Sequence, residues 1–329
     1  MCDECVLIQE WQMCSRILAT RELSEKHTGE NIRNAVDEIL MEFNALRPGN
    51  VYITDNASNM KAAMQGRSWL GCAGHNLNLV LAHGLKPSGT TEPRPRVVTE
   101  IENQNDEDGG ELLQDESISG VSQLIALSKS MVAHVKRSRI QAKLPTTLKQ
   151  SVSTKWNSVL TMLKSIVSNM DELKKLADEH GDRMLQRSLL DINTELLRQT
   201  VGVLEQFDAA TRTLSTDLRP SLHLVYPTKV QLKKHLLPKD GDGPVIINLK
   251  QQLSCKLDSH FPIKPLHLAA TILDPRLKNG ILSAQEKADA VQMLRSMMSE
   301  VEVISDSAPS EIQPELSNPP KKRKVNMLT

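Results

Sequence analysis

A helical hydrophobic period runs almost without interruption from residue 120 to residue 301, and it constrains the fold of this chain more than any other feature. Apolar residues recur there three or four positions apart, which is the spacing that gives an α-helix one apolar face. The best-formed stripe is Trp156, Val159, Leu160, Leu163, Ile166, Val167, Met170 and Leu173, and the last is Ala288, Val291, Leu294, Met298 and Val301. Because aromatic residues make up only 2% of the chain, we expect packed helices with an aliphatic core.

A different pattern precedes this region and predicts alternating strands and helices. Short β-branched or partly alternating runs indicate strands, and a clean helical stripe lies between the first two of them. The expected elements are a strand at 10–18, a helix at 32–46, a strand at 51–54, a helix to about residue 65, a strand at 69–72 and a helix at 75–85.

Asp55 is the candidate site residue of this first region, because it stands where the strand at 51–54 ends and a helix is about to begin. A carboxylate in that place can hold a divalent cation, as in metal-dependent phosphoryl-transfer sites. It can also cap the following helix by accepting a backbone N–H. The local pattern alone favours the cap, since any strand–turn–helix connection is stabilised by one.

Two separated motifs change this balance. The first is TDNASNM at residues 54–60, and the second, CAGHNLNLV at 72–80, begins seventeen residues after Asp55. Together they resemble the ribonuclease H-like core of the hAT transposase family, including its zinc-finger BED-domain relatives. The resemblance implies that Asp55 is the second catalytic aspartate of the family, and that Cys72 and His75 belong to its Cys/Asp-x-x-His motif.

Further stretches extend the resemblance to about residues 8–280. They are HTGENI at 27–32, STKWNS at 153–158, FDAATRTLS at 207–215 and LAATILDPRLK at 268–278. The resemblance implies that Trp156 begins a helical insertion domain and lies near the bound DNA end, where an indole can stack on an unpaired base. At the start of an apolar helical stripe, however, a tryptophan more often only packs, and this pattern favours packing. Lys155 stands where the family has arginine, which keeps the charge but loses a bidentate phosphate contact.

The patterns along the chain predict an α/β plus all-α fold. The resemblance implies that the α/β part is an incomplete ribonuclease H-like core, which a large helical insertion domain interrupts. Residues 100–116 carry eight acids and few apolar residues, so we expect the segment around them to be disordered. The expected parts are a truncated core at 1–85, a disordered acidic linker at 86–118, the helical domain at 119–301 and a disordered tail at 302–329.

The tail contains four consecutive cations, Lys321, Lys322, Arg323 and Lys324, directly after two prolines. Such a run in an extended segment suits the acidic groove of a nuclear import receptor. The alternative is a basic tail that only improves solubility. We expect the first of these, and therefore a nuclear protein.

The resemblance also predicts that the catalytic site is incomplete. A hAT site needs three carboxylates that hold two metal ions. The first aspartate of the family would lie on a strand upstream of the matched segment, and its glutamate in a C-terminal segment that also completes the dimer interface. Neither segment is recognised here, nor is a BED zinc finger. We therefore expect that Asp55 is vestigial and has lost its Mg²⁺, and that the protein has no cofactor, no metal and no enzymatic activity. Whether the chain forms a homodimer stays open, because the dimerisation segment is not recognised.

Composition limits the classes of function further. Lys plus Arg and Asp plus Glu are equal at 40 each, so any DNA contact must come from a local patch rather than from a global basic field. Five irregularly spaced cysteines favour a reducing compartment over a disulfide framework. No apolar run approaches the roughly 18 residues that a membrane span needs, so a soluble protein is expected.

We expect a domesticated or relic hAT transposase-like nuclear protein in DNA-associated or transcription-regulatory interactions. Its partners would be a nuclear import receptor and DNA or chromatin proteins. One alternative is an active metal-dependent transposase or nuclease that uses substitute acids, with Glu10, Asp37 and Glu38 as candidates near Asp55. Another is a protein-interaction scaffold built on the helical region, which would show a large exposed apolar patch.

Overall fold

The computed structural model describes residues 2–9, 12–85, 115–138, 140–152, 156–215, 219–277 and 280–305. Most of the predicted acidic linker and the four cations of the predicted import signal lie outside these residues. The helices extend past both predicted ends of the helical domain, at residues 119 and 301. Helix α4 begins at Asp115, within the predicted linker, and helix α11 continues to Ser305, within the predicted tail. Helices thus extend beyond the apolar stripes from which they were predicted, because polar residues can also continue a helical turn.

The strands form two separate two-stranded sheets. Strands β1 (Cys2–Gln9) and β2 (Gln12–Thr20) make an antiparallel hairpin, in which β2 is the strand expected around residues 10–18 and β1 was not expected. Strands β3 (Tyr52–Thr54) and β4 (Trp69–Gly71) pair in parallel. No ladder joins the two sheets in the described part of the chain, because no strand lies between them to pair with both. The expected ribonuclease H-like core is therefore not confirmed.

Two short helices cover the parallel pair. Helix α1 (Gly29–Glu42) begins at Thr28, whose side chain accepts a hydrogen bond from the Asn31 N–H, and α2 (Ser58–Ala63) packs against it. The core of this unit is small, and its buried members are Ile32, Val36, Ala63 and Met64.

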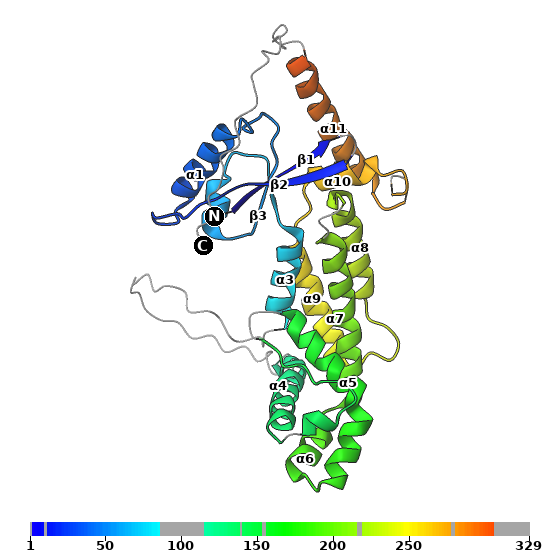
Figure 1. The fold of residues 1–329 in the computed structure, drawn as a ribbon. Helices are drawn as coiled ribbons and strands as arrows, with labels where there is room; N and C mark the ends of the chain where they lie inside the picture. The colour runs from blue at the N-terminus through cyan, green and yellow to red at the C-terminus, as the bar shows by residue number, and fades with distance from the viewer. Residues whose placement is uncertain are drawn as a thin grey trace, which may run out of the picture.

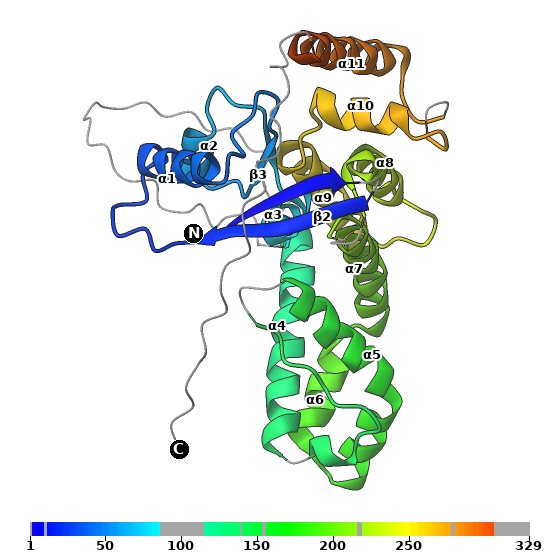
Figure 2. The ribbon, with the colours of Figure 1, turned by 45° about the horizontal axis from the view of Figure 1, so that its top comes forward.

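A much larger core lies in the helical body. Its helices are α3 (Ala73–Gly84), α4 (Asp115–Arg137), α5 (Trp156–Glu179), α6 (Arg183–Asp191), α7 (Thr194–Leu214), α8 (Val225–His235) and α9 (Pro244–His260), with short 3-10 turns at Ile140–Lys143 and Leu222–Leu224. Figures 1 and 2 show an elongated bundle with α6 near one end and the α1 unit attached at its side. The core is mainly aliphatic as expected, and Phe207 and Phe261 are its fully buried aromatic members.

Helix α3 connects the two parts of the molecule. It follows β4 directly in the sequence, yet Leu77, Val80 and Leu81 are completely buried in the core of the helical body. Its main packing partner is α9, and a β-carbon on Gly84 would lie 2.5 Å from Leu253 of that helix. A larger residue at position 84 would therefore force the buried Leu253 side chain, or the helices themselves, to move.

Helices α10 (Pro265–Leu273) and α11 (Ala284–Ser305) pack on each other at one end of the body. The expected apolar stripe of α11 is not its buried face, because Met298 is 63% exposed and Ala290 is the residue that is fully buried. The Tyr226 hydroxyl of α8 donates a 2.8 Å hydrogen bond to Glu286, which holds α11 to the body. Burial and this carboxylate raise the pKa of Tyr226 to about 12. No helix in the described part of the chain has the length and apolar character to cross a lipid bilayer.

Candidate functional site

Asp55 follows β3 directly, as the sequence predicts. Its carboxylate Oδ1 accepts a 3.1 Å hydrogen bond from the Ala57 N–H, and the Thr54 hydroxyl donates to the Asp55 carbonyl. The carboxylate therefore stabilises the turn between β3 and α2 as an Asx turn. It does not cap α2, whose N-cap is Ala57 without a side-chain hydrogen bond. The rest of the Asp55 side chain is exposed to solvent.

A hollow of about 570 Å³ opens beside Asp55. It lies between the segment that follows β2, the start of α1 and the β3–α2 turn, and the Asn59 amide ties these segments together by donating to the His27 carbonyl at 3.1 Å. The residues that line it are Glu22, Leu23, His27, Ile32, Asp55, Ala57, Asn59 and Met60.

Glu22 is the second carboxylate of this hollow, and sequence reasoning missed it. It lies in an irregular segment between β2 and α1, where no periodic pattern marks a residue as part of a site. The acids that the sequence offered as substitutes are not brought to Asp55. Asp37 instead forms a 2.6 Å ion pair with Arg67, Glu38 does not line the hollow, and Glu10 lies outside the described residues.

The residues around Asp55 do not fit the two-metal centre of a transposase. Such a centre needs several carboxylates that converge on the ions. Among the residues that the structure describes, no three histidine, cysteine, aspartate or glutamate side chains are arranged to hold a metal ion. One oxygen of Asp55 is also used by the turn. The described residues around Asp55 therefore provide no ligand set for a two-metal reaction.

The CAGHNLNLV motif forms the start of α3. Cys72 precedes the helix and is a half-buried free thiol, and His75 is half-buried in the first turn. Asn76 is 4% exposed, and its side-chain oxygen accepts a hydrogen bond from the Asn56 amide, next to Asp55. A β-carbon at position 71 would lie 2.5 Å from the Asn56 side-chain oxygen, so a larger residue there would displace Asn56 from this bond.

The same helix holds Trp156 on its other side. Trp156 is the first residue of α5, and its indole N–H donates a hydrogen bond to the side-chain oxygen of Asn78, 78 positions earlier in the chain. His75 and Asn78 are three residues apart, so they lie on the same side of α3. Trp156 is half-buried against the larger core, and Lys155 lies outside the described residues. Three motifs that are far apart in the sequence thus meet at α3.

The LDPR segment at the end of α10 forms a local clasp. The Asp274 carboxylate accepts hydrogen bonds from the Arg276 guanidinium at 2.7 and 3.0 Å and from the Arg276 backbone N–H at 2.9 Å. These bonds lower the pKa of Asp274 to about 2. His223 lies 3.5 Å from the same carboxylate, so the segment joins α10 to the turn before α8.

His267, which directly precedes the LAATILDPRLK motif, is expected to make stability depend on pH. The side chain is 6% exposed, its Nδ1 accepts from the Lys264 N–H at 3.0 Å, and burial followed by the charge of Lys264 lowers its pKa from 6.5 to about 4. The unfolded chain therefore binds the proton first as the pH falls. This contribution to stability is complete above pH 6.5 and is lost towards pH 4, by about 3 kcal/mol.

Urea unfolding of the wild type and of His267→Gln at several pH values between 7 and about 4 measures this contribution. We expect the free energy of unfolding to fall less steeply with decreasing pH in the variant, because glutamine does not titrate. His235 and His260, whose pKa values are also lowered by burial, are present in both proteins and cancel in the comparison. Equal slopes in the two proteins would contradict the assignment to His267.

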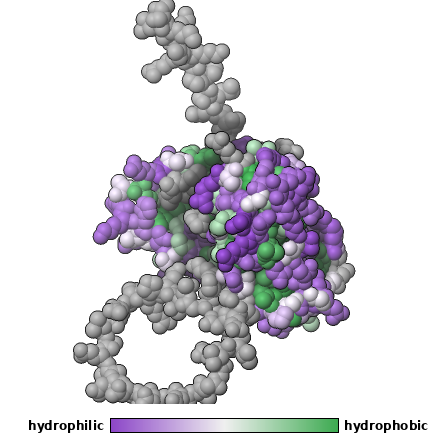
Figure 3. Space-filling model, turned by 90° about the horizontal axis from the view of Figure 1, so that it is seen from below, coloured by the Kyte–Doolittle hydropathy of each residue, from purple (hydrophilic) through white to green (hydrophobic). Residues whose placement is uncertain are grey.

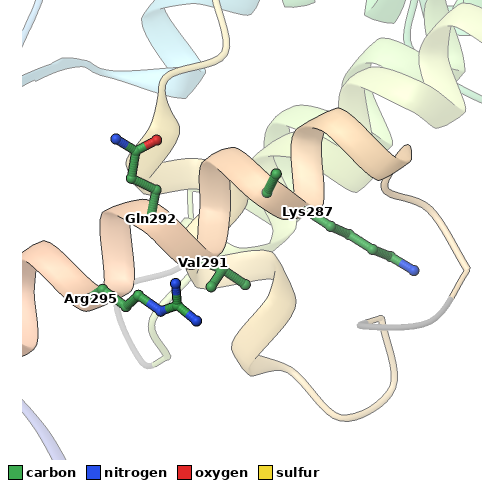
Figure 4. Close-up of a pocket in the computed structure, with 5 residues that line it drawn as sticks. Lys287, Val291, Gln292 and Arg295 are labelled. Carbon is green, nitrogen blue, oxygen red and sulfur yellow. The ribbon is translucent and has the colours of Figure 1, made fainter.

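A second hollow of about 490 Å³ runs along α11. Figure 4 shows Lys287, Val291, Gln292 and Arg295 spaced along this helix beside it. None of the motif residues lines this hollow, and its described lining comes from one helix. The candidate site is therefore the region around α3 and Asp55.

Comparison with known proteins tests the origin of these motifs. No family model matches the chain. The Transposable element Hobo transposase of Drosophila melanogaster is 28% identical over 250 residues, which cover 74% of this chain and 33% of that protein. The chain is related to the hAT transposases.

Two zinc finger proteins are also similar to this chain. Zinc finger protein 618 of Mus musculus is 22% identical over 304 residues, covering 91% of the chain and 29% of that protein. Zinc finger BED domain-containing protein 4 of Homo sapiens is 23% identical over 320 residues, covering 89% and 24%. The hAT resemblance predicted from the motifs is confirmed. The chain spans a third or less of the length of these relatives.

Proposed function

We propose that this hAT-related chain is a DNA-associated nuclear protein that binds DNA containing unpaired nucleotides and does not cleave it. The observation that carries the proposal is the arrangement around α3. The helix joins the Asp55 turn, through Asn76, to Trp156, through Asn78. The described residues near Asp55 do not form a carboxylate cluster that fits a metal ion. The connections of α3 would serve binding of DNA. A carboxylate cluster would be needed only for metal-dependent cleavage.

The chemistry of the site supports an unpaired base as the group that is bound. An indole face can stack on any base, and such contacts contribute about 1–3 kcal/mol per base. The balanced net charge gives no long-range attraction for duplex DNA. Lys155, next to Trp156 in the sequence, is the cation that we propose for the neighbouring phosphate. In this proposal, DNA contact depends on these two neighbouring positions in the sequence and not on the net charge of the chain.

The nuclear role rests on the basic run at 321–324 and on the origin of the chain. In this proposal the run binds an import receptor, and the protein then acts in transcription-regulatory interactions on DNA. The exposed large apolar residues of the predicted helical region are Met184 and Leu190 on α6, Met297 and Met298 on α11, and Val152, Leu237 and Leu273. Figure 3 shows apolar patches separated by hydrophilic side chains on one face. Exposed side chains of this kind are where the scaffold alternative would bind a protein partner.

Fluorescence anisotropy with a labelled DNA hairpin that carries a single-stranded overhang tests the proposal. We expect Trp156→Ala to weaken binding about tenfold or more, because the stacking contact is lost. Asp55→Asn should bind as the wild type does, since that carboxylate faces a turn N–H rather than DNA. A blunt duplex of the same length should bind more weakly than the hairpin. Thermal unfolding of each variant serves as the control for folding.

Incubation of the same DNA with Mg²⁺ or Mn²⁺ tests the absence of cleavage. We expect intact DNA with both the wild type and Asp55→Asn. Metal-dependent cleavage by the wild type that disappears in Asp55→Asn would overturn the proposal in favour of an active transposase or nuclease. Equal binding of the hairpin by the wild type and Trp156→Ala would overturn the proposed DNA contact.

A further inference from the structure

The hydrogen bond between α3 and the first residue of α5 has a consequence for how Trp156 is presented. We propose that Asn78 is a positioning residue, which fixes the indole of Trp156 so that one ring face packs on the core and the other is held open for an unpaired base. This inference rests on the proposed function. It assigns to Asn78 a role that acts through Trp156 and not through contact with DNA.

Trp156 needs such support because of its place in the helix. It is the first residue of α5, so no earlier turn of the helix lies beside its side chain to pack against it. The indole N–H is the only polar group of a tryptophan side chain and acts only as a donor. A hydrogen bond at the ring edge, together with packing on one ring face, determines both side-chain torsions. The Asn78 side-chain oxygen makes that bond.

Asn78 is suited to this role because α3 is anchored on two sides. Leu77 and Leu81, on the neighbouring face, are completely buried in the large core. Asn76 is held to the Asp55 turn through Asn56. The Asn78 side chain itself is exposed, so its hydrogen bond to Trp156 extends from a rigid helix to the protein surface. A contact residue supported in this way keeps its orientation before the ligand arrives, which lowers the entropic cost of binding.

If Asn78 fixes the orientation of the indole, Trp156 can pack on the core and stack on a base at the same time. The indole is only half-buried, although it contacts the large core. The buried part belongs to the packing that the apolar stripe predicts. The exposed part is available to a planar ligand as long as the ring does not rotate. Loss of the Asn78 bond would let the ring turn towards the solvent and would reduce the fraction of molecules that hold it ready to stack a base.

A double-mutant cycle in the full chain tests the inference, with binding of a fluorescein-labelled single-stranded oligonucleotide as the readout. The variants are Asn78→Leu, Asn78→Gln, Trp156→Phe and the combination of Asn78→Leu with Trp156→Phe. We expect Asn78→Leu to weaken binding about fivefold and Asn78→Gln, which keeps the amide oxygen, to weaken it less. Phenylalanine has no N–H, so Asn78→Leu should cause no further loss in the Trp156→Phe background.

Quenching of tryptophan fluorescence by acrylamide is a second readout that a merely structural role would not move. We expect Asn78→Leu to increase the quenching of Trp156, measured as the difference between each protein and its Trp156→Phe counterpart, with an unchanged unfolding midpoint. If Asn78→Leu does not fold, Asn78→Gln takes its place. Its smaller expected effect is measured by the same two readouts, oligonucleotide binding and acrylamide quenching.

Three outcomes separate this inference from the proposed function. Binding by Asn78→Leu at the wild-type level, with binding lost in Trp156→Ala, would overturn the positioning role and leave the proposed function intact. Equal losses from Asn78→Leu in the wild-type and Trp156→Phe backgrounds would also overturn it, because Asn78 would then act on DNA directly. Wild-type binding by Trp156→Ala would overturn the proposed function itself.

Discussion

Replacing Asp242 by alanine is expected to destabilise the protein by about 3 kcal/mol or more. Asp242 precedes α9, and its carboxylate accepts a 2.5 Å hydrogen bond from the Lys250 ammonium, whose side chain is only 3% exposed. It also accepts from the Lys239 N–H at 2.7 Å. Burial alone would raise the pKa of Asp242, but these bonds outweigh it and lower the pKa. Removal of the carboxylate would leave a buried ammonium without its counter-charge.

Two matched variants show whether burial is the cause. The pair between Lys164 and Glu205 has a similar distance of 2.7 Å, but its side chains are 48% and 43% exposed. Glu205→Ala should therefore cost less than about 1 kcal/mol. Adding Lys250→Met to Asp242→Ala should recover much of the lost stability, because it removes the unpaired charge. Urea unfolding at neutral pH measures all three variants. A loss for Asp242→Ala no larger than that for Glu205→Ala would show that Lys250 reaches water.

Amide hydrogen exchange is expected to divide the chain into a less stable and a more stable part. The α1, α2 and β3–β4 unit should open at a free energy at least about 2 kcal/mol below that of α5 and α7, which corresponds to roughly thirtyfold faster exchange. Its core is small, and Ile53 on β3 is 64% exposed. Helix α3 should exchange with the helical body despite its place in the sequence, because Leu77 and Leu81 are buried there.

Two core substitutions provide the control for this division. Val36→Ala should accelerate exchange only in the α1 unit, and Leu163→Ala should accelerate it throughout the helical body, where it should cost about 2–5 kcal/mol. Val36 is 8% exposed in the small core, and Leu163 is completely buried in the large one. Slower exchange in α1 than in α5 and α7 would contradict the division. So would a single exchange rate that responds equally to both substitutions.

Much of the secondary structure and the family relationship could be predicted from the sequence. The stripe of α5 predicts its buried face, since Leu160, Leu163 and Leu173 are all buried. The end of β3 at Asp55 was also expected, and the separated motifs identified the hAT relationship that the comparison confirms. These features depend only on the spacing of residues along the chain, and that spacing can be read directly from the sequence. The stripe of α11 is the exception, because an apolar face does not specify whether a partner covers it.

Only the tertiary structure decided which of these elements meet. The sequence placed α3 with the α/β region, but the structure packs it in the helical body and joins it to Trp156 through Asn78. It also brought Glu22, and not Asp37, to the hollow beside Asp55. Such contacts join residues that are tens of positions apart. They are chosen by shape and hydrogen bonding between packed elements, whereas hydrophobic periodicity records only that one face of an element is to be covered.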